Sequence, residues 1–118
     1  KAPLAWATVG NGLLFTAQIP IDAAGDVVPG GIEAQTRQVL ANLAQTLQRA
    51  GTGVAGLTQV VIYVTDRDHL STVNRLYADF VQPPWPNRAA IIVSGFARES
   101  MLVEMLAYAV VPAHNKAD

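Results

Sequence analysis

The stretch 101-MLVEMLAYAVV-111 carries a single charged residue, Glu104, in an otherwise uncharged and mostly apolar run. Such a run predicts a β-strand over about residues 101–111. Successive side chains of a strand point to opposite faces of its sheet, and here both sets are apolar. A strand that is apolar on both faces is buried on both faces, so this one is expected inside a sheet that is covered on each side.

A second stretch, 84-PWPNRAAIIV-93, combines an apolar run with one basic residue, Arg88. Its prolines exclude a helix and predict a loop over residues 82–86. The apolar residues that follow predict a strand over about 88–94, which opens on the arginine. One guanidinium and one carboxylate, those of Arg88 and Glu104, thus stand where burial is expected. They are the most informative residues of the sequence.

The N-terminal half of the chain predicts a β-hairpin followed by a loop. Apolar runs at residues 4–9 and 13–19 flank the turn sequence 10-GNG-12, and Gly and Asn favour the backbone conformations of tight turns. A Gly-rich segment at residues 22–31 predicts the loop. Further along, residues 57–65 are rich in β-branched side chains and predict a central strand.

Two segments show the three- and four-residue spacing of an amphipathic helix. In the first, apolar residues recur over residues 32–50, and Gly51 ends the helix. In the second, Asp66 caps a helix whose apolar positions extend to Phe80. The predicted order is ββαβαββ, a single α+β domain over residues 1–118 in which both helices cover one face of a mixed sheet.

The composition indicates that another chain covers the second face of the sheet. The 118-residue sequence is 51% hydrophobic and only 14% charged, whereas about a quarter of a typical soluble chain is charged. With so few charges and one layer of helices, the second face is expected to be buried against further copies of the chain. The alternative is a small monomer with an unusually apolar surface.

The charge balance and the residue types exclude several kinds of partner. The net charge is −1, the isoelectric point is about 6.1 and no basic run is present, so no nucleic-acid partner is expected. Residues 2–21 are uncharged, but prolines and glycines interrupt them, so they predict strands and no membrane span. The sequence has no cysteine, which is compatible with the reducing cytoplasm, and a cytoplasmic location is expected.

Two motif-like patterns do not predict a site. The stretch 51-GTGVAG-56 matches a dinucleotide-binding pattern, but it follows a helix and precedes a strand, the reverse of the order that this motif requires. His69 and His114 lie far apart in the sequence, and a helix cap and a surface residue account for the pair Asp66 and His69. No metal ion and no cofactor are therefore expected.

Arg88 and Glu104 have two interpretations from their chemistry alone. In a structural role, they form a buried ion pair, or the arginine extends to solvent from the end of a strand. In a functional role, they form a small polar site in an apolar wall. The planar guanidinium then binds a carboxylate ligand, and the glutamate holds or activates a water molecule.

Six segments resemble one known family, the Rid proteins, which are also called YjgF-like proteins or reactive intermediate deaminases. The resemblance covers nearly the whole chain, and the order of the segments makes it specific. The segments are 15-FTAQIP-20, 35-QTRQVLANLAQTLQRAG-51, 60-VVIYVTD-66, 72-TVNRLYADF-80, 86-PNR-88 and 103-VEMLAYAV-110.

The resemblance implies a chorismate-mutase-like α+β fold and a homotrimer with sites in the clefts between subunits. It implies hydrolytic deamination of reactive 2-imino or 2-enamino acids to 2-oxo acids and ammonia, without a cofactor. Arg88 is then implied to bind the substrate carboxylate, and Glu104 to orient the attacking water. The residues implied to line the substrate site are Asn74, Thr16, Ala17 and Trp85.

The sequence departs from the family pattern at three positions. Leu4 replaces a tyrosine that contacts substrate, Ala17 replaces a glycine, and Ala90 replaces a frequent cysteine. These changes leave open a regulatory trimer that binds a small carboxylate without turnover. Two further functions are disfavoured: a nuclease or translation inhibitor by the acidic isoelectric point, and a chorismate-mutase-like isomerase by the lack of cationic groups besides Arg88.

Overall fold

The computed structural model describes residues 2–112 of the chain. Strands and helices follow one another in the predicted ββαβαββ order, and short 3-10 turns at Val54–Gly56 and Arg67–His69 precede β3 and α2. The elements are β1 (Ala7–Gly10), β2 (Leu13–Gln18), α1 (Gly31–Arg49), β3 (Leu57–Val64), α2 (Leu70–Phe80), β4 (Asn87–Ile92) and β5 (Val103–Val110).

The five strands form one mixed sheet with the order β1-β2-β5-β3-β4. β3 and β4 are parallel and are connected through α2, whereas the other neighbours are antiparallel. β5 lies at the centre, between β2 and β3, and β3, which the sequence predicted as a central strand, lies between β5 and β4. β4 stands at one end of this order and is an edge strand of the described sheet.

The hairpin of β1 and β2 closes through a two-residue turn at Asn11 and Gly12. Both residues have positive φ angles, 51° and 76°, as the turns that match the twist of a hairpin require. β1 begins three residues later than expected, because it pairs with β2 only from Ala7, opposite Thr16. Just before that point, the carbonyl of Trp6 accepts a hydrogen bond from the Thr16 hydroxyl.

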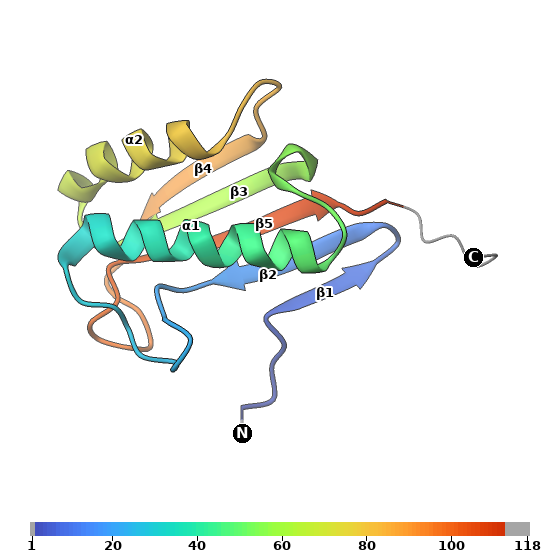
Figure 1. Ribbon diagram of the computed structural model, residues 1–118. Coiled ribbons are helices and arrows are strands. Elements are labelled where there is room, and N and C mark those ends of the chain that lie inside the picture. Colours follow the sequence, from blue (N-terminus) through green and yellow to red (C-terminus); the bar gives the residue numbers. More distant parts are fainter. Residues whose placement is uncertain (1, 113–118) are drawn as a thin grey trace.

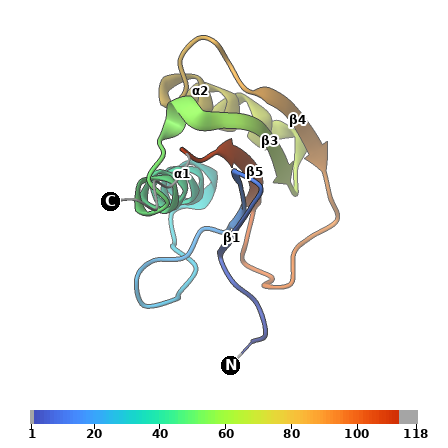
Figure 2. The same cartoon turned by 90° about the vertical axis from the view of Figure 1, so that its right-hand side faces the viewer.

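Both helices cover the same face of the sheet, as predicted (Figures 1 and 2). α1 buries the apolar stripe that its spacing predicted, and Gly51, with a φ of 82°, follows its end. Burial of this stripe against the sheet removes apolar surface from water, which is the main stabilising contribution to such a layer. The most deeply buried apolar residues are Leu14, Val39, Leu43, Leu47, Val60, Ile62, Val64, Val73, Val103, Met105, Ala107 and Ala109.

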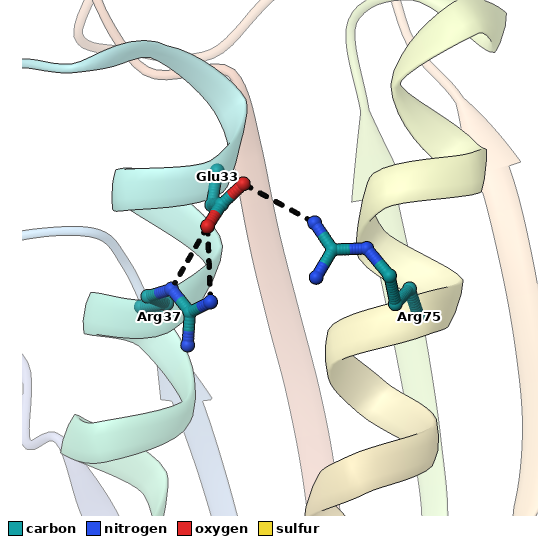
Figure 3. Close-up of polar contacts among 3 residues, drawn as sticks. All are labelled: Glu33, Arg37 and Arg75. Atoms are coloured by element: carbon teal, nitrogen blue, oxygen red, sulfur yellow. Dashed lines mark hydrogen bonds and ion pairs between the residues drawn. The ribbon is translucent and has the colours of Figure 1, made fainter.

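Glu33 links the two helices at the molecular surface. Its carboxylate accepts hydrogen bonds from Arg37, one turn further along α1, at 2.9 Å and from Arg75 of α2 at 3.2 Å (Figure 3). The hydrogen bond and positive charge of Arg37 contribute most to lowering the pKa of Glu33, and those of Arg75 lower it further. Exposed ion pairs of this kind contribute little to stability, so this link adds little to the burial of apolar side chains beneath the two helices.

Asp66 caps the segment that leads into α2, as predicted. Its carboxylate accepts a hydrogen bond from the backbone N–H of Asp68 at 2.8 Å. The cap begins a 3-10 turn rather than the helix itself, and α2 starts only at Leu70.

The face of the sheet that points away from the helices is called the open face below. Along β5, Val103, Met105 and Ala107 are buried beneath the helices. On the other face Glu104, Leu106 and Tyr108 are only half-buried, and Val110 is exposed. Within one chain, the expected burial of β5 on both faces therefore holds for one face only. The strand residues of the open face are Thr8, Gly10, Leu13, Phe15, Ala17, Gln59, Val61, Tyr63, Asn87, Ala89, Ile91, Glu104, Leu106, Tyr108 and Val110.

β4 is not the buried strand that its sequence predicted. All six of its residues, Arg88 included, are exposed. The reason is its position at the edge of the described sheet, where it has a neighbouring strand on one side only. An apolar run indicates a strand but does not show how many neighbours the strand will have.

Candidate functional site

α2 holds the guanidinium of Arg88 at the edge of the sheet. Arg88 lies opposite Val60 in the register of β3 and β4, so its side chain starts on the helix side. Its Nη1 donates a hydrogen bond to Oδ1 of Asn74 at 2.7 Å, and its Cζ lies 5.2 Å from the ring centroid of Tyr77. Asn74 and Tyr77 are three residues apart on α2 and therefore lie on one side of the helix. Together they fix where the positive charge is presented.

Both groups that hold Arg88 are electrically neutral. Within residues 2–112, the ion pairs are those that Glu33 forms with Arg37 and Arg75, and Arg88 forms none. An amide oxygen and an aromatic face orient a guanidinium without neutralising it. The remaining N–H groups of Arg88 can therefore bind a carboxylate in the bidentate geometry that arginine favours.

Glu104 lies on the open face, on the side of the sheet opposite to Arg88. In the register of β3 and β5 it faces Tyr63, whereas Arg88 shares the helix side with Val60 and Ala107. The ion pair between Arg88 and Glu104 that the sequence left open is therefore not formed. Burial among apolar neighbours raises the pKa of the Glu104 carboxyl. A carboxylate with a raised pKa is a stronger proton acceptor for a bound water.

Thr16 and Ala17 line a small cavity of about 250 Å³ at the β1–β2 side of the sheet. The Thr16 hydroxyl is already used inside the chain, because it donates to the Trp6 carbonyl and accepts from Nε2 of Gln18. Ala17 lies on the open face, opposite Leu106. The other lining residues are Ala5, Trp6, Phe15, Leu106 and Tyr108.

Trp85 does not form a pocket wall within one chain. It lies in the loop between α2 and β4, and 70% of its surface is exposed. The chain has a second, larger cavity beside α1. Neither cavity is lined by any of the other predicted site residues, which are Arg88, Asn74, Glu104 and Trp85. Within one chain, Arg88 therefore contacts Asn74, and Thr16 and Ala17 line a cavity elsewhere on the sheet. Glu104 joins neither of these two pairs. Since β5 and β3 separate β2 from β4, the two pairs stand roughly 14 Å apart across the sheet.

Tyr77 is one of the apolar positions of the second predicted helix, which placed it in the core, and it has a second role that the sequence reasoning missed. Its ring is buried, as expected, but it also carries the guanidinium of Arg88. Its hydroxyl is buried without a hydrogen-bond partner among the described residues. The spacing in the sequence could have revealed this contact. Tyr77 follows Asn74 by three residues and so lies on the same side of α2.

Two kinds of feature do not occur in residues 2–112. No helix there is long and apolar enough to cross a membrane. No group of three histidine, aspartate or glutamate side chains there is placed to hold a metal ion. His114, which entered the sequence argument about metals, lies outside the described residues.

Comparison with known proteins identifies the family. The endoribonuclease L-PSP family model matches residues 2–111. A RutC family protein of Pyrococcus horikoshii is 36% identical over 101 residues, covering 84% of this chain and 80% of its own. The 2-iminobutanoate/2-iminopropanoate deaminase of Mus musculus is 32% identical over 103 residues, covering 86% and 76%. A solved structure of a Rid family protein from Yersinia pestis is 37% identical, with a TM-score of 0.89 over 94% of this chain and 90% of that one. The chain therefore belongs to the endoribonuclease L-PSP family, the Rid or YjgF-like family that its sequence resembles.

Proposed function

We propose that the protein hydrolyses reactive 2-imino and 2-enamino acids to 2-oxo acids and ammonia. Membership of the family and the deaminase name of the mouse relative support the reaction class. The observation that carries the proposal is the state of Arg88. Its guanidinium is held by the neutral groups of Asn74 and Tyr77, and its charge is left for the carboxylate that every such substrate carries.

The chemistry requires positioning more than strong acid or base catalysis. Arg88 binds the substrate carboxylate, and Glu104 accepts a proton from the attacking water. A 2-enamino acid first tautomerises to the imine. The water oxygen then bonds to the C=N carbon, and the nitrogen gains the proton that Glu104 accepted, which restores the carboxylate. The C–N bond then breaks, ammonia leaves with the proton of the new hydroxyl, and a 2-oxo acid remains. The raised pKa of Glu104 favours the proton transfer, and no cofactor takes part in these steps.

The proposed site is completed by a second copy of the chain, within a homotrimer. Arg88 and Glu104 start on opposite faces of one sheet, so a single chain does not offer both to one small substrate. The open face is mostly apolar, and Glu104 is the one charged residue on it among the described strands, which supports its burial against another copy. In the assembly, Arg88, Asn74 and Trp85 of one copy face Glu104, Thr16 and Ala17 of the next.

A second candidate is a trimer that binds a small carboxylate without converting it. It uses the same grip of Arg88, and it is favoured by Leu4 and Ala90, which are apolar where the family has a tyrosine and often a cysteine. Cleavage of RNA, which the family description names, is disfavoured by the net charge of −1 and the lack of a basic run. The cytoplasmic location stays a prediction.

The test is the rate of 2-oxo acid release from freshly generated 2-iminopropanoate and 2-iminobutanoate. The wild-type protein is compared with Arg88→Ala and with Arg67→Ala, which removes an exposed arginine from the 3-10 turn before α2. We expect acceleration that is lost in Arg88→Ala and kept in Arg67→Ala. Acceleration that survives Arg88→Ala contradicts the proposal. No acceleration, together with 2-oxobutanoate binding that depends on Arg88, indicates the binding trimer.

A further inference from the structure

A second and larger cavity lies beside α1, on the helix side of the sheet. Its volume is about 690 Å³, within the range of small-molecule sites in proteins. One wall is α1 from Gln38 to Arg49, and the other is the end of β2 with the loop that follows it. In Figure 1, this loop runs from β2 to the start of α1, close to the connection between β4 and β5. The cavity contains neither Arg88 nor Glu104, and it shares Trp6 with the small cavity that Thr16 and Ala17 line.

Hydrogen bonds join the two walls along the cavity, which is called the groove below. Gln18 of β2 donates a hydrogen bond to Thr46, near the end of α1, and the carbonyls of Ile19 and Ile21 accept from Asn42, one turn earlier. The loop therefore runs antiparallel to α1. From Gln38 to Arg49 the helix rises roughly 16 Å, which sets the length of the groove.

An arginine stands at each end of this groove. Arg49 lies in the last turn of α1. Arg98 lies at the other end, where its Nη1 donates a hydrogen bond to the Gly25 carbonyl at 2.7 Å. Within residues 2–112 neither guanidinium forms an ion pair, and Arg98 keeps further N–H groups after its bond to the loop. With Asp22 as the one acidic lining residue, the groove is net positive on a chain whose net charge is −1.

Hydrogen-bond acceptors lie between the two arginines. The amide N–H groups of Gln18 donate to the hydroxyls of Thr16 and Thr46, so its carbonyl oxygen remains as an acceptor. Since the Thr16 hydroxyl gives its own proton to the Trp6 carbonyl, this orientation of the Gln18 amide is fixed. Asp22 uses one carboxylate oxygen for the backbone N–H groups of its loop and keeps the other.

We infer that this groove binds a hydroxylated metabolite with an anionic group at each end. The two guanidinium groups match two oxyanions, whether phosphate or carboxylate, since arginine binds both in the same forked geometry. The acceptors of Gln18 and Asp22 match hydroxyl donors between them. α1, which forms one wall of the groove, lies on the side of the sheet opposite to the open face (Figure 2), so assembly through the open face leaves this wall uncovered.

Isothermal titration of the whole protein with matched six-carbon ligands tests the inference. Fructose 1,6-bisphosphate and glucarate carry an anion at both ends, whereas fructose 6-phosphate and gluconate carry one. We expect at least one two-ended ligand to bind about 10-fold more tightly than its one-ended partner, because it gains a second charge-assisted contact. The pair that shows this advantage identifies the oxyanion as phosphate or carboxylate.

Variants locate the effect and separate it from the deaminase site. Arg49→Gln and Arg98→Gln should each abolish the advantage of the two-ended ligand, while Arg67→Gln and Arg88→Gln keep it. The inference is overturned if no ligand binds saturably, or if one- and two-ended ligands bind alike. It is also overturned if Arg67→Gln removes the advantage as strongly as Arg49→Gln, because general charge attraction then accounts for the binding.

Discussion

Tyr77 carries two groups whose contributions can be separated by mutation. Its hydroxyl is buried and has no hydrogen-bond partner among the described residues, whereas its ring lies 5.2 Å from the guanidinium carbon of Arg88. Tyr77→Phe removes the hydroxyl and keeps the ring. A buried polar group without a partner costs about 1–3 kcal/mol. We therefore expect Tyr77→Phe to raise the free energy of unfolding by roughly 1 kcal/mol, at the lower end of that range.

Tyr77→Leu removes the ring and should act on the substrate site. A cation–π contact at an exposed guanidinium contributes about 0.5–1 kcal/mol. If that contact holds Arg88 in place for a substrate carboxylate, its loss corresponds to a rise of about 2- to 5-fold in KM. Tyr77→Phe keeps the ring, so its KM should stay close to that of the wild type.

Two assays check this prediction. Urea unfolding at one fixed protein concentration gives the stability of each variant, and 2-oxo acid release gives KM. A clear loss of stability in Tyr77→Phe would mean that the hydroxyl has a partner in solution. An unchanged KM in folded Tyr77→Leu would mean that the ring does not position Arg88.

Three further predictions concern the core, the open face and Glu104. Leu43 is fully buried, so Leu43→Ala should lower the free energy of unfolding by about 2–5 kcal/mol in urea titrations; a loss well below this range would mean that the core collapses around the gap. Leu106→Glu places a second carboxylate on the open face and should shift sedimentation velocity towards the monomer, whereas sedimentation like the wild type would show that another surface assembles the protein. Because burial raises the pKa of Glu104, the folded state binds its proton more tightly than the unfolded state does, and stability falls as pH rises from the ordinary to the raised pKa. Glu104→Gln should lack this fall in a series of unfolding curves, and an identical pH dependence would exclude Glu104 as its source.

Local patterns in the sequence were sufficient to predict the elements and their order. The spacing of Val39, Leu43 and Leu47 places them on one side of α1, whatever the rest of the chain does. The β-branched residues of β3 likewise predicted a central strand, and β3 has β5 on one side and β4 on the other. The exposure of β4 could not be predicted in this way, because it depends on which strands lie beside it.

The candidate site was only partly predictable. The contact between Arg88 and Asn74 joins two residues that the family resemblance had placed together. The face on which Arg88 starts depends on its register with Val60, and the sequence does not specify that register. The groove beside α1 depends on how the loop after β2 packs against Asn42, which is a long-range contact without a local signal.

The central claim is that Arg88 of one chain and Glu104 of another act on the same substrate molecule. Co-expression of Arg88→Ala with Glu104→Gln tests it most directly. Each variant alone should be nearly inactive. In a random equal mixture, about one quarter of the sites receive an intact Arg88 and an intact Glu104 from different chains, since each required subunit is present half of the time. The account predicts that 2-oxo acid release recovers to about one quarter of the wild-type rate. A mixture that stays as inactive as the separate variants would contradict it.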